Sequence, residues 1–75
     1  MNSAERAPLL HVAGQALYGS QWQLELARAL GVAPRTMRYY AAGRRVPPEA
    51  WAAIGRLAKA RARALLYLAH DLGTP

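Results

Sequence analysis

The sequence predicts an all-α fold of four or five helices in one compact domain, residues 1–75. Glycines and prolines divide the chain into segments of helical length, and apolar residues recur within each segment at three- and four-residue spacing. No segment alternates apolar and polar residues in the way that a half-buried strand does. A chain of 75 residues leaves room for a single domain.

Size and cysteine content limit how such a fold is stabilised. The chain contains no cysteine, which excludes disulfides, thiolate zinc sites and cysteine nucleophiles. A domain of this length buries only about 60% of the surface that its unfolded chain exposes, so its core is small. Because small domains without disulfides often gain stability from a second copy, we expect a homodimer.

The charge of the chain indicates the kind of partner. Lys and Arg total 10 against 4 Asp and Glu, a formal charge of +6, which suits nucleic acid first and an acidic membrane surface second. All the basic residues except Lys59 are arginine, whose planar fork matches phosphate and guanine, although the codon bias of a GC-rich genome gives the same ratio. The apolar runs are shorter than the roughly 20 residues of a membrane span, and the N-terminus has no signal-peptide pattern. We therefore expect a cytoplasmic protein.

The first part of the chain contains two predicted helices. Pro8 suits the first turn of a helix that Gly19 ends. Ser20 and Gln23 have the spacing of a capping box, which predicts a second helix over residues 21–30. This second helix is expected to stop at the glycine that follows, in a conformation with positive φ.

A short helix follows between a proline and a glycine. Ala33 precedes a proline and is therefore expected to be extended. Pro34 then opens a helix over residues 34–42, because its missing N–H costs nothing in the first turn. Gly43 ends this helix, and a basic loop over residues 44–47 comes next.

The last segment, residues 48–72, begins at a proline and carries a regular apolar seam. Gly55 weakens a helix by roughly 0.5–1 kcal/mol relative to alanine, so the sequence leaves open whether this segment is one helix or two. Only Arg61 interrupts the seam. The seam comprises Trp51, Ile54, Ala58, Arg61, Leu65, Leu68 and Leu72.

The two helices on either side of Gly31 are predicted to form a helix-turn-helix over about residues 21–42. A three-residue turn joins them, which is the spacing of that arrangement. Small Ala27 lies where the second helix must approach closely. The apolar residues that fill the wedge between the helices are Leu26, Leu30, Val32, Met37 and Tyr40. The aromatic residues expected in the core are Trp22, Tyr40 and Trp51.

The stretch WQLELARALGVAPRTMRYYAAG, Trp22 to Gly43, resembles the phage-repressor and Cro-like, or XRE-type, helix-turn-helix family of DNA-binding regulators. In its size and its Arg38-Tyr39-Tyr40 run, the chain is similar to small regulators of phage and mobile elements, including autorepressors associated with anti-CRISPR genes. The resemblance implies a lambda-repressor-like domain that binds DNA. It covers less than a third of the chain directly.

The resemblance also implies which residues read the bases. Residues 34–42 would form the recognition helix, whose N-terminal residues meet base edges in the major groove. Arg35 and Thr36, in its first turn, would point toward DNA, and Arg38 lies one turn further on. An arginine can bind guanine O6 and N7 together. Tyr39 would bond a phosphate or pack against a thymine methyl group.

Phosphate contacts are expected at three further positions. Gln23 matches the phosphate-contacting glutamine of the family, and Arg44 and Arg45 follow the recognition helix. The sequence departs from the family at Ala33, where Ser or Thr commonly caps the helix, and at Pro34, where a polar residue often reads a base. We therefore expect Arg35 and Arg38 to make most of the contacts with the DNA bases. Each charged residue also has the simpler interpretation of a solvated side chain.

The leucine-rich end of the last segment has two interpretations. The four leucines of this end, Leu65, Leu66, Leu68 and Leu72, either form a dimer interface or pack against the first helix. Leu65, Leu68 and Leu72 are the candidates for the dimer interface. Arg61, in the same seam, either pairs with an acid across a dimer or contacts flanking phosphate. Both questions stay open at the level of sequence.

The sequence does not predict an enzyme. His11 and His70 are the only imidazoles, they lie in different helices, and no spaced group of acids accompanies them. We expect both to be solvated. No glycine-rich phosphate loop or metal-ligand spacing is present, so no catalytic residue, metal, cofactor or small-molecule ligand is predicted.

Together these features predict a homodimeric, sequence-specific regulator of transcription that binds an inverted repeat in double-stranded DNA. Half-sites about one helical turn apart, roughly 10 bp, are expected. The expected output is repression of its own operon, at the nucleoid of a bacterial or phage-infected cell.

One alternative is a protein-interaction module, such as an antitoxin or adaptor, that binds another protein through residues 65–72. Another is a basic amphipathic helix, residues 56–72, on an acidic membrane surface.

Overall fold

The computed structural model describes residues 3–73, with side chains from residue 7 onward. The elements are α1 (Ser3–Tyr18), the 3₁₀ helix η1 (Gly19–Gln21), α2 (Trp22–Leu30), α3 (Pro34–Ala41) and α4 (Pro48–Gly73). No strand occurs between residues 3 and 73, so the predicted all-α class is confirmed.

The last element is one uninterrupted helix. α4 runs for 26 residues and passes through Gly55 without a break. A single glycine costs a helix only about 0.5–1 kcal/mol, and the alanines and leucines around it are strong helix formers. The alternative with five helices is therefore wrong for the described part of the chain.

Two details of the predicted helix starts are wrong. α1 begins at Ser3, so Pro8 lies inside the helix and not in its first turn. Proline has no N–H, so one internal hydrogen bond is lost there, yet the helix continues to Tyr18.

The expected capping box is also absent from the start of α2. Ser20 lies within η1, and Gln21, the residue before α2, makes no capping hydrogen bond with its side chain. Because η1 runs directly into α2, the serine is one residue too early to occupy the cap position.

The turn between α2 and α3 follows the local signals of the sequence. Gly31 has a φ of +71°, and its N–H bonds to the Arg28 carbonyl at 3.2 Å. The N–H of Val32 bonds to the Ala27 carbonyl at 3.0 Å. These two bonds form a Schellman motif and satisfy carbonyls that the helix end leaves without partners. Ala33 is extended, with a ψ of 146°, and α3 begins at the next residue. The expected stop, extended residue and restart are confirmed.

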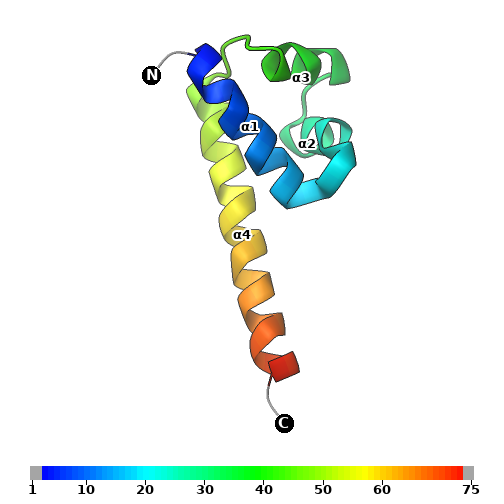
Figure 1. The fold of residues 1–75 in the computed structure, drawn as a ribbon, viewed down its shortest axis with the longest axis vertical. Helices are drawn as coiled ribbons and strands as arrows, with labels where there is room; N and C mark the ends of the chain where they lie inside the picture. Colours follow the sequence, from blue (N-terminus) through cyan, green and yellow to red (C-terminus); the bar gives the residue numbers. More distant parts are fainter. Residues whose placement is uncertain (1–2, 74–75) are drawn as a thin grey trace.

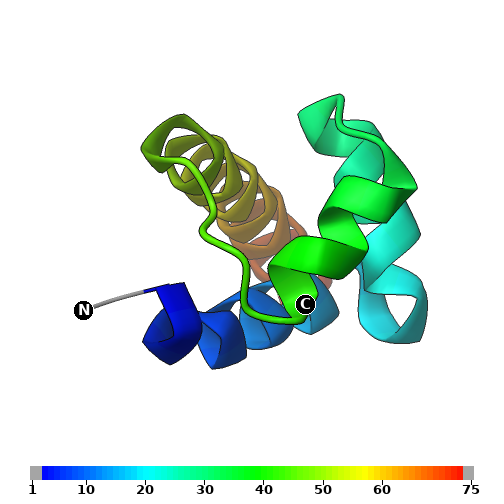
Figure 2. The ribbon, with the colours of Figure 1, turned by 90° about the horizontal axis from the view of Figure 1, so that it is seen from above.

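The helices enclose a small core at one end of an elongated molecule. Figure 1 shows α1 beside the first half of α4, with α2 and α3 to one side, while the second half of α4 runs on alone. The view from above in Figure 2 shows α1, α4 and the α2–α3 pair around a common centre. The molecule measures 48 × 24 × 19 Å. The buried core residues are Leu10, Leu17, Trp22, Leu26, Ala27, Met37, Tyr40, Val46 and Ile54.

The predicted core aromatics are confirmed at two of three positions. Trp22 and Tyr40 are buried. Trp51 is half-buried and packs against the core from the first turn of α4. Leu30 and Val32, expected in the wedge between α2 and α3, are also half-buried against the core.

A buried glycine lets α1 and α2 approach closely. Gly14 lies in the middle of α1, directly against the indole of Trp22. A Cβ added at Gly14 would lie 2.9 Å from Trp22 Cγ and still closer to Cδ2 and Cε3. The indole also meets the His11 ring edge to face, with 5.1 Å between the ring centres. The missing side chain therefore makes room for the largest aromatic residue of the core.

Two long-range hydrogen bonds tie helix ends to distant side chains. His11 Nε2 donates to the Ala41 carbonyl, in the last residue of α3, at 3.1 Å. Arg61 donates to the Leu17 carbonyl, near the end of α1, at 2.7 Å, and its guanidinium lies 5.6 Å from the centre of the Tyr18 ring. Each bond satisfies a carbonyl that the helix end leaves free, and a cation there also interacts favourably with the helix dipole.

These bonds correct two expectations. His11 is half-buried and holds the end of α3, so it is not merely solvated. Arg61 is directed at the end of α1, a role that neither interpretation from the sequence included. Neither bond has a local sequence signal, because the two partners are 30 residues apart in the first bond and 44 residues apart in the second.

Replacing Arg61 with methionine is expected to destabilise the fold by about 1 kcal/mol, because the Leu17 carbonyl loses a charged donor while the aliphatic stem is retained. Arg63→Met is the matched control on the exposed far side of α4 and should change stability by less than about 0.5 kcal/mol. Urea denaturation followed by circular dichroism, at two protein concentrations, measures both free energies of unfolding. Equal stabilities of the two variants would contradict the role of Arg61.

Candidate nucleic-acid interface

The outward face of α3 carries the predicted base-reading residues. Met37 and Tyr40, three residues apart, point into the core. The helical period of 3.6 residues therefore turns the residues between and before them outward. Arg35, Arg38 and Tyr39 are exposed, whereas Thr36 is half-buried. The structure thus brings three of the four residues together on one accessible face and leaves Thr36 at its edge.

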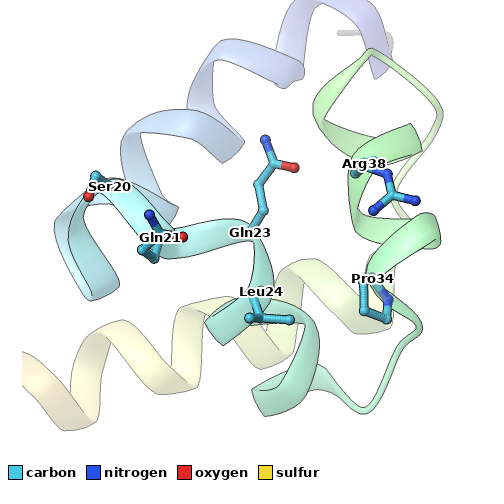
Figure 3. Close-up of a pocket in the computed structure, with 6 residues that line it drawn as sticks. All are labelled: Ser20, Gln21, Gln23, Leu24, Pro34 and Arg38. Atoms are coloured by element: carbon cyan, nitrogen blue, oxygen red, sulfur yellow. The ribbon is translucent and has the colours of Figure 1, made fainter.

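A hollow separates the start of α2 from α3. Its volume is about 290 Å³, and Figure 3 shows Gln23 and Arg38 on its two sides. Half-buried Gln23 comes from the first turn of α2, where no side chain caps the helix. The positive end of the α2 dipole and the Arg38 guanidinium are thus near one space, an arrangement that suits an anion. The residues that line the hollow are Ser20, Gln21, Gln23, Leu24, Pro34 and Arg38.

The loop after α3 returns one arginine to this face. Gly43 has a φ of +115°, which reverses the chain, and the Arg44 N–H bonds to the Tyr39 carbonyl at 2.9 Å. The Arg44 guanidinium lies over the Tyr39 ring, 4.2 Å from its centre. This cation–π contact fixes both side chains relative to α3. Arg45 is exposed in the same loop. The sequence had indicated Tyr39 and Arg44 separately, without any signal that they form a pair.

The charges along this face have one sign. Between Glu25 and Glu49 the chain has no acidic residue. The arginines in that interval are Arg28, Arg35, Arg38, Arg44 and Arg45. Arg28 lies 3.5 Å from Glu25 in an exposed ion pair on α2. The other four are on α3 and the loop that follows it, so their charges add to a positive potential on one side of the molecule.

The leucine-rich end of α4 lies at the opposite end of the molecule from α3 (Figure 1). Leu65, Leu68 and Leu72 are all more than half exposed. The interpretation that these leucines pack against the first helix is wrong for Leu66, Leu68 and Leu72, which are exposed because α1 ends near Arg61 and does not reach them. Only Leu65 lies at the edge of a groove that α1 also lines.

Three negative observations complete the description. Within residues 3–73, no group of three or more His, Cys, Asp or Glu side chains is arranged to hold a metal ion. No helix in the same range is long and apolar enough to cross a membrane. No family model, curated protein or solved structure matches the chain.

Proposed function

We propose that the protein is a sequence-specific regulator that binds double-stranded DNA, with α2 and α3 acting as a helix-turn-helix. The observation that carries this proposal is the outward face of α3, which has Arg35, Arg38 and Tyr39 exposed in a segment without acidic residues. An α-helix fits the major groove of B-DNA. A face of this charge gains both from phosphate attraction and from base contacts.

In this proposal each residue has a separate task. Arg35 and Arg38 bind guanine O6 and N7, a contact worth about 1–3 kcal/mol of discrimination each. Tyr39 packs against a thymine methyl group, with the stacked Arg44 held beside it. Gln23 and the hollow at the start of α2 hold a backbone phosphate, as helix N-termini do. Arg45 adds a phosphate contact from the loop.

We further propose that the protein binds an inverted repeat as a homodimer and represses transcription of its own operon. A two-fold protein matches a two-fold DNA site, because each subunit then presents the same helix to each half-site. A dimer seated on a promoter represses by occupancy alone. The resemblance to phage-repressor-like regulators supports this output and a place in the cytoplasm, at the nucleoid.

The affinity for DNA is expected to fall steeply with salt. If a dimer neutralises roughly eight phosphates, the logarithm of the binding constant should decrease with the logarithm of salt concentration at a slope near −7. Fluorescence anisotropy of a labelled duplex measures the slope, and selection from a random DNA pool supplies the specific site. A flat salt dependence, or a pool that yields no common sequence, would contradict the proposal.

A second candidate function is a protein-interaction module of the antitoxin or adaptor type. It is favoured by the exposed leucine-rich end of α4, a surface that monomers seldom leave uncovered. Co-expression with the product of the neighbouring gene, followed by gel filtration, tests it. A stable complex that lacks any affinity for DNA would replace the first proposal.

A further inference from the structure

The apolar seam of α4 is covered in its first half and uncovered in its second. Trp51 and Ile54 pack into the core, and α1 follows the seam as far as Arg61. Leu68 and Leu72 continue the same three- and four-residue spacing beyond the end of α1. The uncovered part is thus a direct continuation of an interface inside the molecule.

A groove lined by small residues lies next to these leucines. It runs between α1 and α4 and has a volume of about 230 Å³. Arg61 at its edge already bonds to the Leu17 carbonyl, so the one charge of the seam has a partner within the chain. The lining residues are Ala13, Ala16, Leu17, Ala58, Arg61, Ala62 and Leu65. The same helix therefore presents large apolar side chains on one side of Leu65 and a shallow apolar groove on the other.

We propose that a second copy of the chain covers this seam, with the two α4 helices antiparallel and Leu65 near the two-fold axis. Leu72 of each copy then lies opposite Ala58 of the other, and Leu68 opposite Ala62. The leucines of each copy fill the groove of its partner, which is the reciprocal contact that a two-fold interface requires. This proposal refines the homodimer of the proposed function but does not depend on DNA.

The groove also explains the direction of the helices. In a parallel pair, Leu68 and Leu72 would meet their own counterparts and the groove beside Ala58 would stay empty. A parallel partner would also have to follow the seam toward residues that α1 already covers. In an antiparallel pair, the α4 helix of the partner instead ends at its Gly73, close to the level of Ala58.

Charge favours this face of α4 over the opposite one. Arg63, Leu66, Tyr67 and His70 share the opposite face, which also has exposed apolar side chains. The helical period adds Arg56 and Lys59 to it, so two such faces brought together would place cations against cations. The uncovered part of the seam beyond Arg61 has only apolar residues. Self-association through the seam therefore avoids burying unpaired charge.

The antiparallel pair places the two α3 helices at opposite ends of the assembly. Leu65 lies 17 residues from Pro48, so the first residues of the two α4 helices are about 50 Å apart at a rise of about 1.5 Å per residue. Figure 1 shows α3 at the same end of the molecule as the start of α4. Successive major grooves on one side of DNA are only about 34 Å apart. The DNA half-sites are therefore expected to be more than one helical turn apart. This spacing is wider than the single turn expected from the sequence.

Sedimentation equilibrium without DNA tests the interface. We expect the wild-type chain to form dimers, and Leu68→Ser to raise the dimer Kd by about tenfold or more, since each dimer loses two buried leucines. Leu66→Ser is the matched control on the opposite face and should change Kd by less than about threefold. Both leucines are exposed in the single chain, 52% for Leu68 and 72% for Leu66, so neither change should alter the helical circular dichroism spectrum.

Cross-linking tests the direction, because the natural chain has no cysteine. With a short bismaleimide, Leu65→Cys should cross-link to its own counterpart, whereas Leu72→Cys should not. Efficient cross-linking of Leu72→Cys would show a parallel pair and overturn the antiparallel arrangement. A monomeric wild-type chain, or a larger effect of Leu66→Ser than of Leu68→Ser, would overturn the interface. A dimer that fails to bind DNA would leave the interface intact and refute only the proposed function.

Discussion

Gly14→Ala is expected to lower the free energy of unfolding by about 1–3 kcal/mol, although alanine is the better helix former. The new methyl group would overlap the indole of Trp22, which is buried in the core, so the indole or α1 has to shift. Overpacking of a rigid core residue is one of the few ways in which a single substitution has an effect of this size. In a domain of this length the melting temperature should fall by roughly 5–25 °C. Thermal denaturation followed by circular dichroism measures the change.

Gly55→Ala is the matched control for this experiment. Gly55 is also inside a helix, but a Cβ added there would meet nothing within 4 Å. The substitution should therefore stabilise the fold by about 0.5–1 kcal/mol through helix propensity alone. If both variants gain stability, the close approach of Trp22 to α1 is not a feature of the protein.

Arg35→Ala is expected to reduce the preference for the selected DNA site over random DNA by about a hundredfold. In the proposed complex a dimer would lose two guanine contacts, each worth about 1–3 kcal/mol. Because Arg35 is exposed on α3, the fold should be unaffected. Competition binding with specific and random duplexes at one fixed salt concentration measures the ratio.

Arg56→Ala removes the same charge from α4, on the opposite side from the seam, and serves as the control. It should weaken binding to both duplexes to a similar and small extent, because a distant charge contributes only to non-specific attraction. If the Arg35→Ala variant binds DNA with normal affinity and keeps its preference for the selected site over random DNA, the base-reading role of Arg35 is refuted.

The backbone of this protein was predictable wherever one residue controls its own φ and ψ. Gly31 ends α2, Ala33 is extended because a proline follows, and Pro34 starts α3. The prediction failed at Pro8 and Ser20, whose usual places at helix starts are only preferences.

The candidate site was predictable as a set of residues but not as an arrangement. Helical spacing separates inward Met37 and Tyr40 from outward Arg35 and Arg38 without knowledge of any other helix. The stacking of Arg44 on Tyr39 depends on how Gly43 turns the chain back, and no spacing rule specifies that contact. The partial burial of Thr36 likewise follows from its neighbours in the folded chain.

The sequence was sufficient for the all-α class, for most of the helix limits and for a positive face on α3, because these follow from composition and from signals a few residues long. Packing between distant segments was needed for the rest. Gly14 is required only because Trp22 crosses it, and Arg61 holds the end of α1 across 44 residues. The leucine-rich end of α4 is uncovered because α1 is too short to reach it. Such contacts leave no periodic trace in a single chain, so they become visible only when the helices are placed side by side.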